Sequence, residues 1–537
     1  MSFRSVSISL PGFQDFLTCW ATDERNRYSP DSSVESTGRN DKQNAGVDRT
    51  RVCGQLGGKT VTQQEQLETS LSLTINGERV RLKGISPTTT LLEYLRINGW
   101  VGTKEGCGDG DCGACTVAIV AEGADNQPHY QAVNSCLIPI GSLAGRQIIT
   151  VEGIANGALH PVQQAMVETG GSQCGYCTPG FIMSLFAAYY DGTIDDGALE
   201  GNLCRCTGYL PIRRAAQQVA KATPIDRFSQ TLAAATTNLE PVRYTDHEYQ
   251  FFRPTRLQEA IDLLQHNPQA VLVAGATDLG LEMSHHRQSF PVLISLEAVS
   301  ELKQIGETPD FVEIGAAVPL SQVETQLRGI FPSLDEMLHW FAARQVRNRA
   351  TIGGNLGTAS PIGDLPPVLL ALDTQVQITG IAGDRSLPLA QFFKGYRQTE
   401  LQPGEIIRSI QIPRQPTPGT ARRLSQSYKI GKRGTDDISI VAASFTIDLD
   451  AEDRILQARL AYGGVAATPV RAIEVEQRLI GQSWTRETVQ QVKPDLREAF
   501  TPLTDLRASA DYRKLLIANL FEKFFVEMER QAVALGG

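Results

Sequence analysis

The sequence has no apolar run that reaches the ~18 residues that a membrane-spanning helix needs, and residues 181–190 are among its longest such stretches. No apolar segment follows the first arginine, so a secretory signal is not visible. No block of basic residues is present and the net charge is −9, which argues against nucleic acid as a partner. With 41% hydrophobic and 20% charged residues, the chain is expected to be globular, with no membrane partner.

Apolar periodicity is missing from the N-terminal part. Residues 21–70 are rich in Ser, Thr, Asn, Gln, Asp and Arg. Such composition cannot bury enough apolar surface to fold, so we expect residues 1–70 to form a disordered extension and assign it no function. The 537-residue chain is long enough for three or four domains.

Eight of the ten cysteines form two groups of four, and the first group has the order Cys107-x4-Cys112-x2-Cys115, closed by Cys136. The order C-x4-C-x2-C…C is that of the plant-type [2Fe–2S] ferredoxins. The loop around it is rich in glycine, which lets backbone N–H groups point at sulfur. The alternative is a glycine-rich turn with buried structural cysteines.

The second group pairs Cys174-x2-Cys177 with Cys204-x-Cys206. Paired cysteines also hold structural zinc, and that alternative stays open here. The tight C-x-C spacing and the ferredoxin-like group upstream favour a second iron–sulfur cluster. Two clusters on one chain predict electrons passing in series. Cysteines used as thiolates fit a reducing compartment, so we expect a cytoplasmic protein.

The pattern of expected elements divides the rest of the chain. Asn76-Gly77 between alternating runs predicts a hairpin that opens a small α+β domain over residues 71–155. Helical signals dominate residues 156–224, and a polar linker is expected over residues 225–245. Residues 246–420 and 421–530 are expected to form two further domains, the last with strands followed by helices.

Two glycine-rich segments, residues 275–280 and 351–358, lie in the third of these domains. Glycine-rich turns let backbone amides approach phosphate oxygens closely. Neither segment matches G-x-G-x-x-G or a Walker loop, so no Rossmann or P-loop prediction follows. Either segment alone could be an ordinary tight turn, but both together, downstream of two clusters, indicate a dinucleotide such as FAD.

Residues 106–115, 173–180 and 202–209 resemble the iron–sulfur signatures of the molybdenum hydroxylases, and residues 351–365 are similar to their flavin segment. The resemblance covers about residues 71–530 and is greatest to the small iron–sulfur and FAD subunit in the bacterial xanthine dehydrogenase branch. It implies an α+β multidomain fold with four parts. These are a β-grasp ferredoxin domain, an all-α [2Fe–2S] domain, a vanillyl-alcohol-oxidase-type FAD domain and an α+β flavoprotein C-terminal domain.

The resemblance also implies the cofactor-binding residues. All eight cysteines above would be cluster ligands, Gln173 would face a partner's pterin, and Tyr396 and Asp436 would lie where NAD approaches. The residues implied for FAD are Leu272, Val273, Ala274, Gly275, Ala276, Thr277, Asp278, Leu279, Phe341, Thr351, Gly354, Asn355, Asp364, Ile407 and Lys429. Phe341 could instead be a core residue, and Asp436 could belong to a solvated turn.

The resemblance finally implies a function. The chain would pass electrons from a molybdenum centre through two [2Fe–2S] clusters to FAD and then to NAD, while the complex oxidises hypoxanthine and xanthine to urate. Since the chain ends at Gly537 without a molybdopterin domain, we expect a large partner subunit that binds molybdopterin, in a dimer of heterodimers. No catalytic side chain is expected here. The alternatives are another hydroxylase, acting on aldehydes, carbon monoxide or N-heterocycles, and a stand-alone NADH-linked reductase.

Overall fold

The computed structural model describes residues 67–536 apart from 193 and 221–225, and these belong to one compact unit. The disorder expected for residues 1–66 concerns positions outside the described residues. For residues 67–70 that prediction was wrong. The Glu68 N–H donates to Arg243 O at 2.8 Å, and Ser70 begins strand β1. Local composition does not predict this pairing, because Glu68 pairs with a strand that is distant in sequence.

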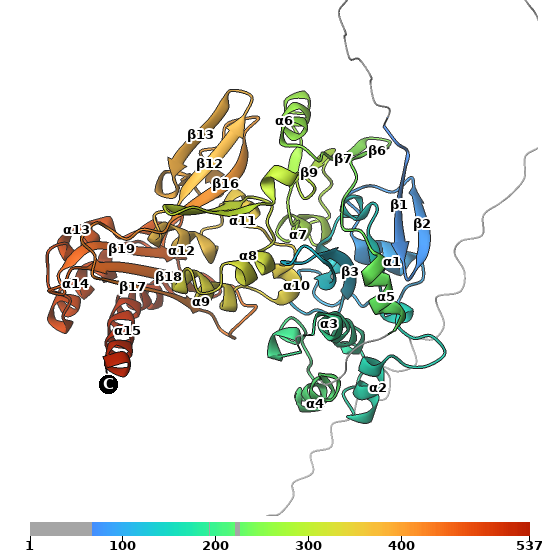
Figure 1. Ribbon diagram of the computed structural model, residues 1–537, viewed down its shortest axis with the longest axis horizontal. Coiled ribbons are helices and arrows are strands. Elements are labelled where there is room, and N and C mark those ends of the chain that lie inside the picture. Colours follow the sequence, from blue (N-terminus) through green and yellow to red (C-terminus); the bar gives the residue numbers. More distant parts are fainter. Residues whose placement is uncertain (1–66, 193, 221–225, 537) are drawn as a thin grey trace, which may run out of the picture. The chain divides into compact units, whose positions relative to one another are not determined.

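The first part of the described chain is a mixed sheet with one helix (Figure 1, blue). Its elements are β1 (Ser70–Ile75), β2 (Glu78–Lys83), α1 (Leu91–Ile97), β3 (Thr116–Glu122), β4 (Pro128–Asn134), η1 (Ser135–Leu137), η2 (Ile140–Leu143) and β5 (Gln147–Ile149). The strand order is β2-β1-β5-β3-β4, with β1 and β5 parallel. Asn76 and Gly77, at φ 54° and 88°, make the tight turn that Asn-Gly predicts. This is the expected β-grasp arrangement, which we call the ferredoxin part.

The second part is helical, as expected. Its elements are η3 (Val151–Gly153), α2 (Pro161–Glu168), α3 (Thr178–Asp191), η4 (Asp196–Ala198), α4 (Leu210–Val219) and α5 (Arg227–Ala234). Pro161 and Pro179 occupy first-turn positions of α2 and α3, where a missing N–H costs nothing. The second cysteine group lies on the turns that precede α3 and α4.

The linker expected over residues 225–245 is contradicted by helix α5 and strand β6 (Val242–Asp246). The Asp226 side chain caps α5, accepting from the N–H groups of Phe228 and Ser229. Phe228 is buried against Tyr130 of the ferredoxin part. The helix is only 8 residues long, so its period is too short to stand out, and tertiary packing stabilises it.

The third part contains two larger sheets and a small two-stranded one. The elements of its first lobe are β6, β7 (Tyr249–Arg253), α6 (Leu257–His266), β8 (Val271–Val273), α7 (Leu279–Ser284), β9 (Val292–Ser295) and η5 (Ser300–Leu302). The strand order is β6-β7-β9-β8, in which β7, β9 and β8 run parallel. Loops at the carboxyl ends of β8 and β9 therefore meet at one edge of this sheet.

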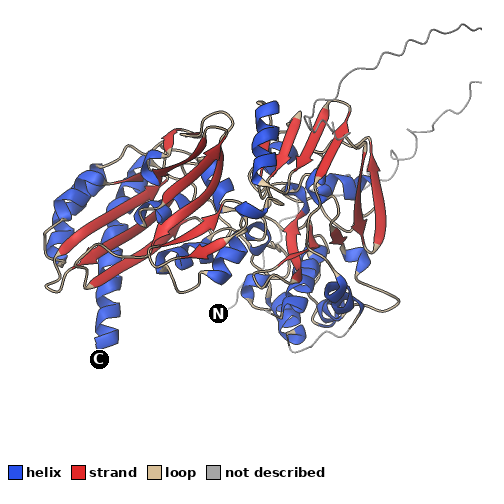
Figure 2. Cartoon of the chain, turned by 45° about the horizontal axis from the view of Figure 1, so that its top comes forward, coloured by secondary structure: helices blue, strands red, loops and turns tan. Residues whose placement is uncertain are grey.

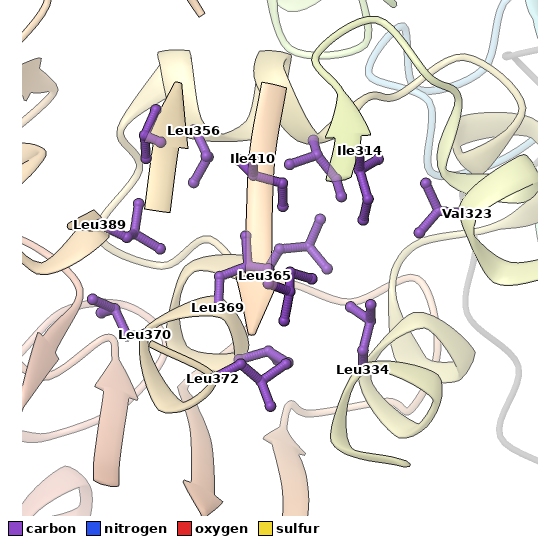
Figure 3. Close-up of a cluster of buried hydrophobic side chains, with 14 of the residues drawn as sticks. Ile314, Val323, Leu334, Leu356, Leu365, Leu369, Leu370, Leu372, Leu389 and Ile410 are labelled. Atoms are coloured by element: carbon purple, nitrogen blue, oxygen red, sulfur yellow. The ribbon is translucent and has the colours of Figure 1, made fainter. Parts of the chain in front are cut away.

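The second lobe is an antiparallel sheet of order β10-β11-β16-β12-β13, packed on helices. Its elements are β10 (Ile305–Glu307), β11 (Phe311–Gly315), α8 (Leu320–Gln326), α9 (Pro332–Trp340), α10 (Arg344–Arg347), α11 (Ile352–Thr358), α12 (Leu365–Ala371), β12 (Gln375–Gly380), β13 (Gly383–Pro388), η6 (Leu389–Gln391), β14 (Phe393–Gly395), β15 (Gln398–Thr399) and β16 (Ile406–Pro413). Figure 3 shows the core, where Ile314 and Ile410 from the sheet meet Leu365 and Leu369 from α12.

The C-terminal part is an antiparallel sheet with helices on both faces. Its elements are β17 (Arg422–Ile430), β18 (Val441–Leu449), β19 (Ile455–Gly463), β20 (Val470–Arg471), α13 (Ile473–Leu479), α14 (Arg486–Glu498) and α15 (Ala510–Gly536). Every residue of β18 is buried. Ala442 packs in the hydrophobic core that includes the side chains of α12, and Phe445 packs in the core that includes those of α15. Figure 2 shows these strands beside their helices. No helix of the described residues is long and apolar enough to cross a membrane.

Candidate iron–sulfur and flavin sites

The structure brings the first cysteine group together as two pairs. The Sγ atoms of Cys115 and Cys136 are 3.4 Å apart and buried. Cys107 and Cys112 form the other pair, and the backbone N–H of each donates to the sulfur of the other at 3.3 Å. Each iron of a [2Fe–2S] cluster takes two terminal thiolates, so two pairs are the arrangement that such a cluster needs.

Glycines shape the loop around these thiols. Gly108, Gly110 and Gly113 have φ of 76°, 90° and 63°, a region that glycine enters at little cost. A Cβ on Gly106 would lie 2.6 Å from the Cys112 sulfur, so any larger residue would push the loop away from it. The loop therefore fits a group bound at the sulfurs better than it fits an ordinary turn.

Within each pair, one thiol ionises more easily than the other. The hydrogen bond from the Cys107 thiol lowers the pKa of Cys112 to about 6, and that same bond with burial raises the pKa of Cys107. Likewise, the bond between Cys115 and Cys136 lowers the pKa of the first and raises that of the second. A bound cluster would take the place of these shared protons, because the thiolate is the form of cysteine that binds metal.

The second group also forms pairs, nearer the surface. The Sγ atoms of Cys174 and Cys206 are 3.2 Å apart, and both residues are exposed. Cys177 is hydrogen-bonded to Cys204, whose sulfur lies 3.0 Å from the Thr207 hydroxyl. In the described residues, no three His, Cys, Asp or Glu side chains gather as around a single ion. The paired thiols fit a two-iron cluster.

The two cysteine groups are joined by direct backbone contact. The Leu203 N–H donates to the carbonyl oxygen of Cys112 at 3.0 Å, and the Asn202 amide donates to Gly113 O at 3.0 Å. A Cβ on Gly180 would lie 2.2 Å from Gly113 O, so only glycine permits this approach. The chain segments that carry the two cysteine groups are therefore joined by direct hydrogen bonds.

Helix α7 connects the first cysteine loop to the flavin lobe. The Ser284 hydroxyl donates to Gly108 O at 2.6 Å, and Nε2 of His285 lies 4.0 Å from an Asp109 oxygen. A Cβ on Gly280 would lie 2.4 Å from Leu137 O, next to Cys136, one of the predicted cluster ligands. The opposite end of α7 adjoins the first glycine-rich segment. Sequence patterns gave no indication of these contacts, because they join residues that are far apart in the chain, 176 positions for Ser284 and Gly108.

The first flavin segment, residues 272–279, runs from β8 into α7 at the carboxyl edge of the parallel strands. Ligands bind in crevices at such edges. Ala276 adopts φ 66°, and a Cβ on Gly275 would lie 1.9 Å from Arg349 O. At its end, Asp278 lies 3.3 Å from the Thr358 hydroxyl and 3.7 Å from Arg397. These last contacts bring the two glycine-rich segments together.

The second flavin segment begins at Thr351, whose hydroxyl accepts from the Gly354 N–H at 3.0 Å. A Cβ on Gly353 would lie 2.5 Å from the Ala316 side chain. Oδ1 of Asn355 is buried and has no hydrogen-bond partner among the described residues. A buried acceptor of this kind costs about 1–3 kcal/mol unless something supplies a donor, and a bound flavin nucleotide fits that need.

Other residues predicted for FAD meet through one buried network. Nζ of Lys429 lies 2.8 Å from Asp364 Oδ2 and 3.0 Å from the carbonyl oxygen of Trp340, which precedes Phe341. The Ser439 hydroxyl donates to the other Asp364 oxygen at 2.6 Å. Phe341 and Ile407, at 8% and 6% exposure, pack in the same core. Their contact with a flavin stays a prediction.

The residues predicted for NAD and for the partner lie at the surface or near it. Tyr396 is 64% exposed, and Gln173 is exposed beside Cys174. Asp436 adopts φ 56°, and burial together with the charge of Asp111 raises its pKa to about 7. Arg433 lies 3.4 Å from Asp111, so this segment contacts the first cysteine loop.

Sequence models of four protein families match the chain in order. Residues 73–141 match the 2Fe-2S iron-sulfur cluster binding domain, and residues 150–217 match the [2Fe-2S] binding domain. Residues 247–415 match the FAD binding domain in molybdopterin dehydrogenase. Residues 426–528 match the CO dehydrogenase flavoprotein C-terminal domain. The chain therefore carries two [2Fe–2S] domains and an FAD-binding domain.

Similar curated proteins include xanthine dehydrogenase 1 of Arabidopsis thaliana, 33% identical over 85% of this chain, and the xanthine dehydrogenase/oxidase of Mus musculus, 33% identical over 84%. The chain spans only 40% and 38% of their lengths.

A solved quinoline 2-oxidoreductase of Pseudomonas putida is 26% identical, with a TM-score of 0.48 over 53% of this chain and 98% of its own. Taken together, the four matched domains and the curated relatives place this chain in the molybdenum hydroxylase family, as its iron–sulfur and flavin region.

Proposed function

We propose that this chain is the electron-transfer component of an NAD-dependent xanthine dehydrogenase. A partner subunit would bind molybdopterin and oxidise the purine. This chain would bind the two [2Fe–2S] clusters and FAD, and NAD would be the final acceptor. Its domain boundaries, 71–155, 156–224, 246–420 and 421–530, are part of the proposal, with residues 226–246 containing helix α5 and strand β6.

One observation carries the proposal: the first cysteine loop contacts both neighbours in the expected series. Leu203, beside ligand Cys204, donates to Cys112 O at 3.0 Å. Ser284 of the flavin lobe donates to Gly108 O at 2.6 Å. A loop held from both sides supports a middle position between the second cluster and the flavin.

The protein's contribution would be to position the cofactors and set their potentials, while the cofactors supply the chemistry. Bound at these sites, the clusters carry single electrons and the flavin exchanges hydride with NAD. Glycine contacts keep the cysteine segments close, backbone N–H groups at the sulfurs stabilise negative charge, and Lys429 supplies a buried cation beside the predicted flavin residues. No side chain of this chain is assigned as an acid, base or nucleophile.

The partner would dock at the second cysteine group. Cys174 and Cys206 are exposed there beside Gln173, so a pterin on another subunit can approach that cluster. We propose a dimer of heterodimers for the complex. All eight described cysteines are free thiols, which supports a reducing, cytoplasmic location.

Activity assays of the purified native complex would test the proposal. With NAD as acceptor, hypoxanthine and xanthine should be turned over, whereas aldehydes, N-heterocycles and carbon monoxide should not. Turnover of one of the latter instead would identify another hydroxylase. The isolated chain should oxidise NADH with an artificial acceptor but should not oxidise xanthine. A native protein that purifies with no molybdenum-containing partner and still oxidises NADH would favour the stand-alone reductase.

A further inference from the structure

Four buried charged residues lie where the ferredoxin part meets the flavin lobe, and neither cysteine group involves them. They are Arg146 before β5, Arg253 at the end of β7, Glu297 after β9, and Arg349 before the second flavin segment. We call them the arginine cluster. Arg253 is 1% exposed and Arg146 and Arg349 are each 8% exposed.

Glu297 holds two of the arginines at once. Its Oε2 accepts from Nη2 of Arg146 and from Nη1 of Arg349, each at 2.8 Å. Arg253 instead donates only to backbone carbonyls, including Ala144 O of the ferredoxin part at 2.9 Å. The cluster thus connects four stretches of chain that are far apart in sequence.

The charges of the cluster do not cancel. Burial opposes ionisation of Glu297, but the charges of Arg146, Arg349 and Arg253 outweigh it and lower its pKa to about 2. Burial lowers the pKa of Arg253 to about 10, which still leaves it protonated at neutral pH. Three guanidinium groups against one carboxylate leave a net charge of +2 within the cluster, and the exposed Glu240 acts on Arg253 from outside it.

Hydrogen bonds within the cluster do not satisfy all of the charged groups. Nε of Arg146, Nε and Nη2 of Arg349, and Oε1 of Glu297 are buried without a partner among the described residues, so three unpaired donors stand against one unpaired acceptor. Removing such a charge from water without compensation is costly, so a nearby anion would stabilise it.

The cluster lies directly behind the first flavin segment. Strands β8 and β9 pair at Val273 and Ser295, and the Leu296 N–H donates to Val273 O at 2.7 Å. Glu297 therefore follows the end of β9 next to the point where β8 ends and residues 274–278 begin. Arg349 also contacts this loop: a Cβ on Gly275 would lie 1.9 Å from the carbonyl oxygen of Arg349.

We propose that the arginine cluster is a positioning device for the diphosphate of FAD, acting through the loop at residues 274–278 by its unbalanced positive charge. This proposal rests on the proposed function, in which that loop holds the flavin nucleotide. A doubly negative diphosphate balances the net charge of the cluster, and the low dielectric between them strengthens the attraction. Because Arg146 belongs to the ferredoxin part, FAD binding and packing of that part on the flavin lobe would reinforce each other.

The competing interpretation is a purely structural ion-pair network. Breaking either half of a buried pair destabilises a fold whatever its purpose, so lost stability cannot decide. The sign of the effect on FAD affinity distinguishes the positioning role from a purely structural network. Arg146→Met lowers the cluster charge and Glu297→Gln raises it, yet both break the same ion pair.

The test measures the dissociation constants of FAD and of riboflavin, which lacks phosphate, with the full chain after flavin removal. Arg146→Met should weaken FAD binding about tenfold and leave riboflavin binding unchanged. Arg146→Lys, which keeps the charge, should restore FAD affinity. Glu297→Gln, which raises the positive charge of the cluster, should tighten FAD binding. Arg423→Met breaks the buried pair with Asp448 in the C-terminal sheet and should lower only the melting temperature.

Weaker FAD binding in both Arg146→Met and Glu297→Gln, or a change in neither, would overturn the proposal in favour of a structural network. Should Arg146→Met not fold, Glu297→Gln decides alone: tighter FAD binding supports the proposal, and unchanged or weaker FAD binding contradicts it. A wild-type chain that binds no FAD would instead contradict the proposed function, so the two failures are distinguishable.

Discussion

At the scale of single residues, the surface near the flavin offers the sharpest tests. Tyr396 is 64% exposed, and Asp436 sits in a left-handed conformation beside the first cysteine loop. A carboxylate there shapes the field around a flavin, and an exposed tyrosine can stack on an incoming nucleotide. Both roles come from the family resemblance, and the structure adds only their placement.

We predict that Asp436→Ala and Tyr396→Ala slow NAD-linked turnover by the assembled complex about tenfold, while dye-linked purine oxidation and iron content stay nearly unchanged. Steady-state assays with the two acceptors would measure this. Gln402→Ala, at an exposed site on the same lobe, serves as the control. A parallel fall of both activities would mean that the two residues are structural.

A second prediction concerns pH. Burial first, and then the charge of Asp111, raises the pKa of Asp436 to about 7. Since the folded pKa lies above the unfolded value, the stability from protonated Asp436 is full below about pH 4 and is lost as pH rises through about 7. Asp436→Asn cannot ionise and tolerates a positive φ. Its melting temperature relative to wild type should therefore rise between pH 4 and pH 8. A constant difference across that range would contradict the raised pKa.

At the scale of elements, close approach by glycine holds the cysteine segments together. Gly180, in α3, has no room for a Cβ because Gly113 O would lie 2.2 Å from it. We predict that Gly180→Ala destabilises the chain by about 1–3 kcal/mol despite the better helix propensity of alanine. Gly306→Ala, where nothing lies within 4 Å, should have little effect.

Thermal unfolding and the electron-spin resonance signal of the second cluster would report on Gly180→Ala. Undiminished stability and an unchanged signal would show that the backbone contact between the two segments is not needed.

Elements with strong local signals could be predicted from the sequence, and those built by tertiary packing could not. Asn76-Gly77 predicts its hairpin, and Pro161 predicts the first turn of α2, because both restrict the local backbone. Helix α5 was missed because Phe228 is stabilised by distant aromatic rings. The cysteine groups stand out by spacing alone, whereas Ser284 and the arginine cluster involve partners more than 100 positions away and leave no local pattern.

At the scale of the whole molecule, the proposed cofactor sites form a series. Cys174 and Cys206 are exposed at one end, the first cysteine loop lies in the middle, and α7 joins that loop to the flavin segment. Each link is a contact between described residues, and under the proposed function electrons pass along this series.

Anaerobic titration of the isolated chain with NADH tests this series most directly. The account predicts that NADH bleaches the flavin and reduces two [2Fe–2S] clusters, seen as two distinct electron-spin signals, with iron and acid-labile sulfide near four per chain. If dithionite produced both signals but NADH bleached the flavin and left the clusters oxidised, or if stoichiometric zinc replaced one cluster, the central claim would be wrong.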